Sequence, residues 1–412
     1  MTKNIFLLLG GNKLNFGILE KFKKLGYLVY VVDWNEHPQL TGDKHYKLDV
    51  KNYQSIIEKL KEDKIIDKVA FTYSSIDLAV TSVAQINKAI GLKTINNEAL
   101  KYTSSKSMQT MKWAEAGILN KISLKFEEFN EKISQLNKEH KIIIKPDNSA
   151  SSRGISIISK DSNIEEIKLA FEKAKNEATN KIVVVEEFVE GTEYTVEMIG
   201  DDFNNVCVYA ISKKTHTNNT ENNRIAIKLH YNAVSNELQN KIAEFGIKCY
   251  KALGFSNSLG HLEVIVKNDG TITPVEIGAR SSGFIASNLV DIASGASFLE
   301  EIIRVQNGGK VENGLHIQSK FSSMYFFYDF PDDLEIKKEC SLLDFVDNSI
   351  ISLYQDRKNI TLGRIFDKID NDNARLGFEI LKGPKEIMTE EYINKKEQEM
   401  LDKMFGRVSY VL

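Results

Sequence analysis

The sequence predicts an α/β fold built from more than one domain. Over residues 1–93, apolar runs of strand length alternate with amphipathic stretches of helical length, a pattern typical of a parallel sheet covered by helices. Further along the chain, strand patterns outnumber helical ones. The 412 residues are 42% hydrophobic and 27% charged, as in ordinary globular proteins, and this length allows roughly two to four domains.

Charge and cysteine content exclude several classes of function. The formal net charge is −3, so no overall cationic field attracts nucleic acid or an anionic membrane. The three cysteines are far apart and match neither a zinc site nor a disulfide framework. The apolar run near the N-terminus is too short for a signal sequence or a membrane span. We therefore expect a cytoplasmic protein whose partners include neither nucleic acid nor membrane.

The N-terminal part follows the order of a doubly wound fold. Parallel strands joined by right-handed crossovers place helices on both faces of their sheet. We therefore predict a Rossmann-like domain. The predicted strands are 4–9, 28–33 and 68–73, and the predicted helices are 16–25, 53–60 and 78–90.

The rest of the chain contains two strand-rich blocks and a C-terminal region. Residues 122–188 predict a small α+β module, and residues 193–277 predict a second block of strands. The polar stretch 213–223 is predicted to be a flexible loop. The predicted helices are 127–138, 163–175, 236–253 and 390–404.

A glycine-rich turn follows the first predicted strand. Gly10, Gly11 and Gly17, with Asp33 after the second strand, suggest the way dinucleotide-binding folds hold pyrophosphate and ribose. The spacing is not GxGxxG, however. An NAD-dependent oxidoreductase therefore stays open beside two other interpretations, a structural turn and a site for another small ligand.

A second glycine-containing loop suggests phosphate binding. In KIIIKPDNSASSRGI (141–155), a strand ends at Lys145, Pro146 stops the ladder, and small residues lead to Gly154. Exposed backbone N–H groups in such a loop can close over a polyphosphate while Lys145 supplies a positive charge. A surface hairpin with an incidental lysine is the alternative.

Two further segments carry groups that suit a nucleotide and a metal. After the apolar strand KIVVV, the C=O of Glu187 and the N–H of Val189 could pair with adenine beside Phe188. Glu263 and Glu276 lie on neighbouring strand patterns separated by a turn, so a hairpin would place two hard oxygen ligands side by side, as magnesium requires. Strand carboxylates that simply face solvent are the alternative.

With these features in this order, the chain resembles ATP-grasp enzymes over nearly its whole length. The matching segments are KPDNSASSRGI, EEFVEGTEYTVE and PVEIGARSSG. It is similar to L-amino acid ligases and to the ATP-grasp domain of the carbamoyl-phosphate synthase large chain. The resemblance implies an ATP-grasp fold with a Rossmann-like domain (1–93), a linker helix and α+β lid (94–190), a catalytic subdomain (191–310) and a β-rich C-terminal α+β region (311–412).

The resemblance also implies ATP and Mg²⁺ as cofactors and assigns roles to individual residues. Glu263 and Glu276 would be magnesium ligands, and Arg280 would steady the transferring phosphate. Gly278 stands where many members have an asparagine that completes the metal shell, which leaves the third ligand open. The implied ATP-binding residues are Lys106, Lys145, Ser151, Ser152, Gly154, Glu186, Glu187, Phe188, Val189 and Glu193.

The activity implied by the resemblance is ligation of a carboxylate to an amine. ATP would phosphorylate a small carboxylic acid, and an amine would attack the acyl phosphate to give an amide, with an amino acid among the candidate substrates. Carboxylation or carbamoyl chemistry with bicarbonate is an alternative, and so is an ATP-binding protein without catalysis. Homodimers are common among similar proteins.

Three more side chains are weighed individually. His230 is a candidate for substrate contact because it is predicted near the acceptor side of the cleft, and Asn288, which follows Arg280 in the chain, is a candidate for orienting the substrate. A structural histidine at a strand end is the alternative for His230. His261 is expected to point to the opposite face of its strand from Glu263 and to serve packing.

Overall fold

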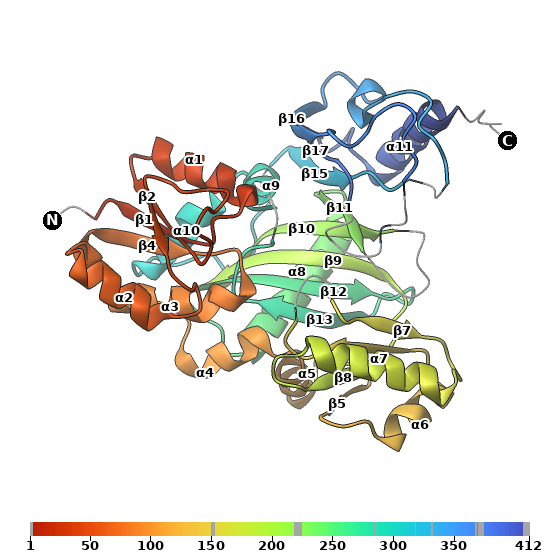
Figure 1. Cartoon of the computed structure of the whole chain (residues 1–412), viewed down its shortest axis with the longest axis horizontal. Coiled ribbons are helices and arrows are strands. Elements are labelled where there is room, and N and C mark those ends of the chain that lie inside the picture. Colours follow the sequence, from red (N-terminus) through yellow and green to blue (C-terminus); the bar gives the residue numbers. More distant parts are fainter. Residues whose placement is uncertain are drawn as a thin grey trace.

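The strands within the described part of the chain form three sheets, which correspond to three regions of the ribbon in Figure 1. The computed structural model describes residues 3–149, 153–217, 225–283, 286–317, 319–330, 333–366, 369 and 375–406. Within these ranges, no helix has the length and apolar character needed to cross a bilayer. The predicted α/β class is confirmed.

The first sheet is parallel throughout, with the strand order β3-β2-β1-β4. Every residue of β1 is buried, because helices cover both faces of the sheet. Figure 1 shows α1 on one side of these strands and α2 and α3 on the other. The elements are β1 (Ile5–Leu9), α1 (Phe16–Lys24), β2 (Leu28–Asp33), β3 (Lys44–Lys47), α2 (Tyr53–Glu62), β4 (Val69–Tyr73) and α3 (Val80–Ala89).

The predicted parallel sheet is therefore confirmed, but one strand was missed. β3 reads KHYK, and only Tyr46 of its four side chains is buried. A short polar strand at the edge of a sheet has neither the apolar run nor the alternation that identifies a strand in sequence.

The second sheet is antiparallel, with the order β5-β8-β6-β7, and α6 and α7 pack on it. Two helices, α4 and α5, lead into it from the first sheet. We call the unit formed by residues 123–187 the lid sheet. Its elements and the preceding helices are α4 (Asn97–Leu100), α5 (Lys106–Glu115), β5 (Ser123–Phe126), α6 (Glu131–Glu139), β6 (Ile142–Pro146), β7 (Ser156–Ile158), α7 (Ile164–Glu177) and β8 (Val183–Glu187).

The third sheet is the largest and has the order β13-β12-β9-β10-β11-β15-β17-β16, with β14 paired to β10. Helix α8 packs on one face through a core that includes Val196, Met198 and Tyr250. The strands are β9 (Thr192–Gly200), β10 (Val206–His216), β11 (Ala226–Tyr231), β12 (Ser258–Val266), β13 (Ile272–Gly278), β14 (Gly314–Leu315), β15 (Phe321–Phe327), β16 (Ile351–Asp356) and β17 (Phe378–Pro384). The helices are α8 (Asn236–Ala252), α9 (Ala286–Ser294), α10 (Phe298–Gln306) and α11 (Glu390–Phe405).

The large sheet differs from the prediction in two respects. Residues 213–216 belong to β10, so the prediction of a loop there was wrong; Lys214 is paired in register with Glu193 and with Leu229. Residues 218–223 lie outside the described residues. Strands β15 to β17 continue the sheet that begins with β9, across the boundary predicted at residue 310, and the four-domain division stays a prediction.

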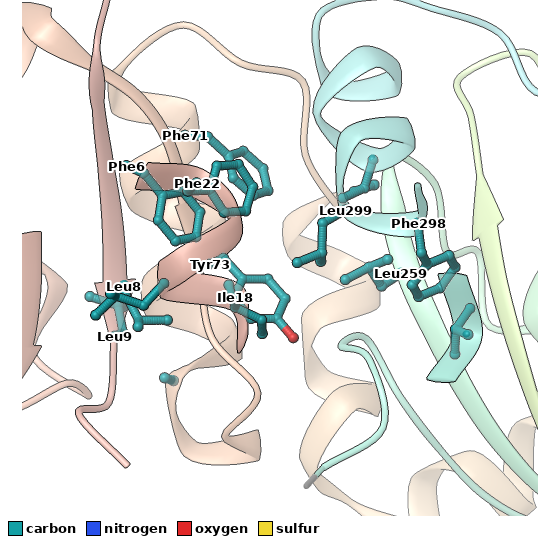
Figure 2. Packing of buried hydrophobic residues seen from close by; sticks show 14 of the residues in the cluster. Phe6, Leu8, Leu9, Ile18, Phe22, Phe71, Tyr73, Leu259, Phe298 and Leu299 are labelled. Carbon is teal, nitrogen blue, oxygen red and sulfur yellow. The ribbon is translucent and has the colours of Figure 1, made fainter. Parts of the chain in front are cut away.

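A continuous apolar core joins the first sheet to the large one. Phe6 and Phe22 stack with ring centroids 3.9 Å apart in the first unit. Figure 2 shows these rings with Phe71 and Tyr73 on one side, facing Leu299, Phe298 and Leu259 on the other. All of these side chains belong to one buried cluster, so the position of the first sheet relative to the large sheet is fixed by packing.

The lid sheet has a small core of its own, which makes it sensitive to a single cavity. Phe171 of α7 is fully buried and lies edge-on to Phe129 at 5.8 Å. We expect Phe171→Ala to destabilise the lid sheet by about 3–5 kcal/mol, measured as faster amide hydrogen exchange in β6 and β8. Leu169→Ala on the exposed face of α7 is the control; equal exchange in the two variants would contradict this packing.

Candidate functional site

Two glutamates face each other across the β12–β13 hairpin. Glu263 and Glu276 are register partners, and the turn between their strands places Gly270 at φ +82°, a conformation that favours glycine. Because side chains alternate along a strand, both carboxylates lie on the face of the sheet opposite α8. The hairpin that the sequence predicts therefore exists, and it brings the two side chains together.

Each of these carboxylates is bound by a lysine. Lys106 Nζ lies 2.8 Å from Glu276 Oε2, and Lys214 Nζ lies 2.9 Å from Glu263 Oε1. Lys214 also pairs with Glu193, which accepts a second contact from His216 at 3.2 Å. Burial alone would raise the pKa of the Glu263 carboxyl, but the positive charge of Lys214 outweighs burial and lowers this pKa. Burial would also raise the pKa of the Glu276 carboxyl, but Lys106 lowers it, so both carboxylates stay ionised.

Lys106 reaches Glu276 because its helix is fixed at both ends of the first turn. Asp147 begins the segment 147–155 between β6 and β7, which we call the lid loop, and it accepts hydrogen bonds from the Ser107 N–H (2.6 Å) and the Ser105 hydroxyl (2.8 Å). Gln109 exchanges two hydrogen bonds with the main chain of Ile277 on β13, at 2.8 and 3.0 Å. Helix α5 therefore connects the lid sheet to the strand that carries Glu276.

Lys145 lies in a buried group with one carboxylate and a second lysine. Lys145 Nζ and Lys121 Nζ are each 2.7 Å from Glu186 Oε2, and the Ser123 hydroxyl donates to the other oxygen at 3.0 Å. Burial would raise the pKa of Glu186, but the two ammonium groups lower it to about 2. Burial also lowers the pKa of Lys121, although Glu186 opposes this effect. Sequence reasoning missed Lys121, which follows no motif.

The segment after β8 is held in an extended form at the edge of this group. The N–H groups of Glu187 and Phe188 donate to the carbonyls of Ile122 (3.0 Å) and Lys141 (2.8 Å). Lys141 lies over the Phe188 ring at 4.4 Å, and Val189 is buried. This rigid strand end adjoins Lys145 through Glu186, and its pairing with adenine stays a prediction.

Arg280 follows β13 and forms an ion pair with the N-terminal unit. Its Nε and Nη2 atoms each lie 2.6 Å from an oxygen of Asp77, and its Nη1 donates to the Ser281 carbonyl at 2.9 Å. Gly278 packs beside this pair, since a Cβ there would lie 3.3 Å from Asp77 Oδ1 and from Arg280 Cγ. An asparagine at this position would crowd the ion pair. No local pattern in the sequence pointed to Asp77.

The expectation for His261 was wrong. His261 and Glu263 are two residues apart on β12 and so share a face, and His261 Nε2 lies 3.7 Å from Glu263 Oε1. His261 Nδ1 is 2.6 Å from the buried Glu197 carboxylate. Burial would lower the pKa of His261, but Glu197 raises it to about 9. Strand alternation, applied correctly, would have found this contact.

The structure does not bring every predicted residue to this cluster. His230 is the register partner of Lys213 and so lies on the opposite face from Lys214, with Nε2 2.9 Å from the Ser322 hydroxyl. Burial lowers its pKa to about 3, as for a neutral structural histidine. Asn288 of α9 lies against Gly17 of α1, where any Cβ would be 2.2 Å from its amide nitrogen.

The lid loop itself is only partly described. Gly154 has φ +73° and packs against Glu177 of α7. Lys106 Nζ donates to the Ser149 carbonyl at 2.9 Å, so the start of the loop lies beside Glu276. Ser151 and Ser152 lie outside the described residues, and their contact with phosphate stays a prediction.

The glycine turn of the first sheet has no acidic group free for ribose. Asp33 is buried and accepts hydrogen bonds from the N–H groups of Gly11 (2.7 Å) and Asn35 (2.8 Å). A Cβ on Gly11 would lie 2.6 Å from the Leu40 carbonyl, so this glycine serves close packing. These contacts favour the structural turn over NAD binding.

The donors at the hairpin suit magnesium only together with a nucleotide. Among the residues that the structure describes, no group of three or more His, Cys, Asp and Glu side chains could hold a metal ion. Magnesium is commonly held by one or two carboxylates, with phosphate oxygens and water completing six ligands. Glu263 and Glu276 fit that requirement, and their lysine partners show that the site favours cations.

Comparison with known proteins agrees with this geometry. Residues 138–288 match the family model described as the ATP-grasp domain. A D-alanine–D-alanine ligase from Buchnera aphidicola is 26% identical over 218 residues, which cover 48% of this chain and 63% of that ligase. The match thus spans less than two thirds of that relative.

Solved structures extend the similarity to the whole chain. An L-amino acid ligase from Bacillus licheniformis superposes with a TM-score of 0.72 at 15% identity, covering 98% of both chains. An N5-carboxyaminoimidazole synthetase from Staphylococcus aureus, complexed with ADP, gives 0.67 at 13% identity, again covering 98% of both chains. At such identities the likeness concerns the fold.

The chain therefore contains an ATP-grasp domain over residues 138–288. The lid loop, the β8 strand end and the β12–β13 hairpin all lie within these residues.

The buried group around Glu186 predicts a pH-dependent loss of stability. With Glu186→Gln, two buried ammonium groups lose their partner, and we expect the free energy of unfolding at pH 7 to fall by about 3–5 kcal/mol. Because the pKa of Glu186 is lowered from its usual 4.5 to about 2, its contribution is present above pH 4.5 and is lost as the pH falls towards 2. Urea unfolding from pH 7 to 3 should show the two proteins converging in stability below pH 4.5.

The exposed Glu190 supplies the control for this measurement. Glu190→Gln should unfold like the wild type at each pH. A gap between wild type and Glu186→Gln that stays constant from pH 7 to 3 would show that Glu186 is not the titrating partner of the two lysines.

Proposed function

We propose that the protein is an ATP- and Mg²⁺-dependent carboxylate–amine ligase that forms an amide or peptide bond on a small metabolite. The observation that carries the proposal is the opposition of Glu263 and Glu276 with Lys106 beside them, at the point where the lid loop begins. This is an array of charges suited to triphosphate and metal, and Arg280 lies next to it. The similarity to two ligases supports ligation as the reaction.

The proposed reaction has two steps. An oxygen of the acid attacks the γ-phosphorus of ATP, the bond to the ADP oxygen breaks, and an acyl phosphate forms. The nitrogen of an amine then attacks the carbonyl carbon, phosphate leaves, and the nitrogen loses a proton to give the amide. Both steps need positioning and charge neutralisation more than a side-chain nucleophile.

The chain's own residues supply the positioning and the charge. Lys106 and Lys145 would exchange their present carboxylate partners for phosphate oxygens, and Arg280 would stabilise negative charge as it develops. The lid loop, with Gly154 and the serines before it, would exclude water that otherwise hydrolyses the acyl phosphate. Magnesium held by Glu263 and Glu276 would neutralise charge on the phosphates.

The nucleotide would lie between the lid sheet and the large sheet. We assign the adenine hinge to residues 186–189 and the ribose contact to Glu193, which is near Glu263 through their common partner Lys214. The three cysteines are free and buried, which supports the proposed cytoplasmic location. A homodimer stays a prediction.

The first test is ADP release with Mg²⁺ and ATP against small carboxylic acids and amines, offered singly and in pairs. We expect release that needs one acid and one amine together. Release that needs bicarbonate would instead identify a carboxylase, and ATP binding without release under any condition would identify a binding protein.

The second part of the test removes one carboxylate. We expect Glu276→Gln to lower kcat by about 100- to 1000-fold, because one ligand of the metal is lost and Lys106 loses its partner. Glu237→Gln on α8, an exposed carboxylate paired only to Lys241, is the control and should keep full activity. Full activity in Glu276→Gln, with the fold intact by circular dichroism, would contradict the metal assignment.

A further inference from the structure

The ion pair between Asp77 and Arg280 connects segments that lie far apart in the sequence. Asp77 begins the short 3-10 helix Asp77–Ala79 that follows β4, and Arg280 lies two residues after the end of β13. Two hydrogen bonds of 2.6 Å join the guanidinium to both carboxylate oxygens. The side chains of Asp77 and Arg280 are 30% and 14% exposed, so the pair is only partly buried.

This ion pair adjoins the proposed reaction centre. It lies against Gly278, which is two residues from Glu276 and on the same face of β13. Burial would lower the pKa of Arg280, but Asp77, with smaller contributions from Glu276 and Glu263, raises it. A group bound between Asp77 and Arg280 would therefore be next to the carboxylates assigned to metal and phosphate.

The two segments do not depend on the ion pair to stay together. The Tyr73 hydroxyl is hydrogen-bonded to the Ser281 hydroxyl beside it. Tyr73 also belongs to the buried cluster that joins the first sheet to α10, as Figure 2 shows. The segments that carry Asp77 and Arg280 are thus joined by other contacts, and the ion pair is not needed to hold them together.

The pair discriminates between kinds of acid by charge. A simple carboxylate that approaches Arg280 meets the negative charge of Asp77 at short range, and opening the pair for it leaves Asp77 without a partner. An α-amino acid carries a carboxylate for Arg280 and an ammonium group for Asp77. It can enter between them so that one ion pair becomes two and no charge is left unpaired.

We propose that Asp77 binds the α-ammonium group of an amino acid whose carboxylate is activated beside Arg280, and so selects amino acids against simple carboxylates and bicarbonate. This inference rests on the proposed ligase function and names the substrate class of the same site. The selection combines repulsion of the wrong substrate with attraction of the right one.

The experiment compares amino acids with their analogues that lack the amino group, such as L-alanine with propanoate. ADP release is measured with ATP, Mg²⁺ and hydroxylamine as a common nucleophile, for wild type and Asp77→Asn. We expect the wild type to prefer amino acids, and the preference in kcat/KM to fall about 10- to 100-fold in the variant, the value of one hydrogen bond to a charged group. The KM for ATP should stay unchanged.

Tyr73→Phe is the matched control, since it removes a contact between the same two segments without changing the ion pair. It should keep the wild-type preference. A preference that survives in Asp77→Asn, or a wild type that uses propanoate as well as alanine, would overturn the inference and leave the ligase proposal standing.

Direct binding separates the two proposals if no acid releases ADP. Silence across all acids would overturn the ligase proposal. Calorimetry with ADP and Mg²⁺ present would then decide the inference: saturable binding of an amino acid that is weakened in Asp77→Asn supports it, and absence of such binding, or equal binding by both proteins, overturns it.

Discussion

The opposition of Glu263 and Glu276 across one hairpin is the constraint on which the rest of the site depends. Two carboxylates on neighbouring strands repel each other, and the surrounding structure offsets that repulsion with one lysine each. Lys106 comes from the helix before the lid sheet, and Lys214 comes from β10. The ion pairs at the hairpin therefore involve three parts of the chain: α5, β10 and the hairpin itself. Helix α5 also connects the hairpin to the lid sheet, because the N–H of its Ser107 donates to Asp147 and its Gln109 donates to the Ile277 carbonyl.

Much of the fold could be predicted because its signals are local. The parallel unit follows from strand and helix periods, and α7, α8 and α11 begin within one residue of their predicted starts. The polar stretch from Lys213 failed because composition indicated a loop while pairing with β9 and β11 made a strand. Pairing partners so far apart in sequence leave no local pattern, and the same holds for the edge strand β3.

The residues of the site also divide into those that have a local signal in the sequence and those that have none. Lys145, Glu263 and Glu276 were predictable because each ends or alternates on a strand beside a turn. Lys121 and Asp77 were not, since their importance comes only from long-range contacts with Glu186 and Arg280. His230 was weighed as a substrate contact against a structural histidine at a strand end, and the register of β11, which places it on the opposite face from Lys214, favours the structural interpretation.

The dependence of ADP affinity on Mg²⁺ shows whether Glu263 and Glu276 hold the metal. Isothermal titration of wild type and Glu263→Gln, with and without Mg²⁺, isolates the carboxylate from any chemistry, and Lys214 keeps Glu193 as its partner in the variant. We expect Mg²⁺ to strengthen ADP binding by the wild type, and most of this strengthening to be lost in Glu263→Gln. Equal strengthening in both proteins would show that the hairpin carboxylates do not hold the metal.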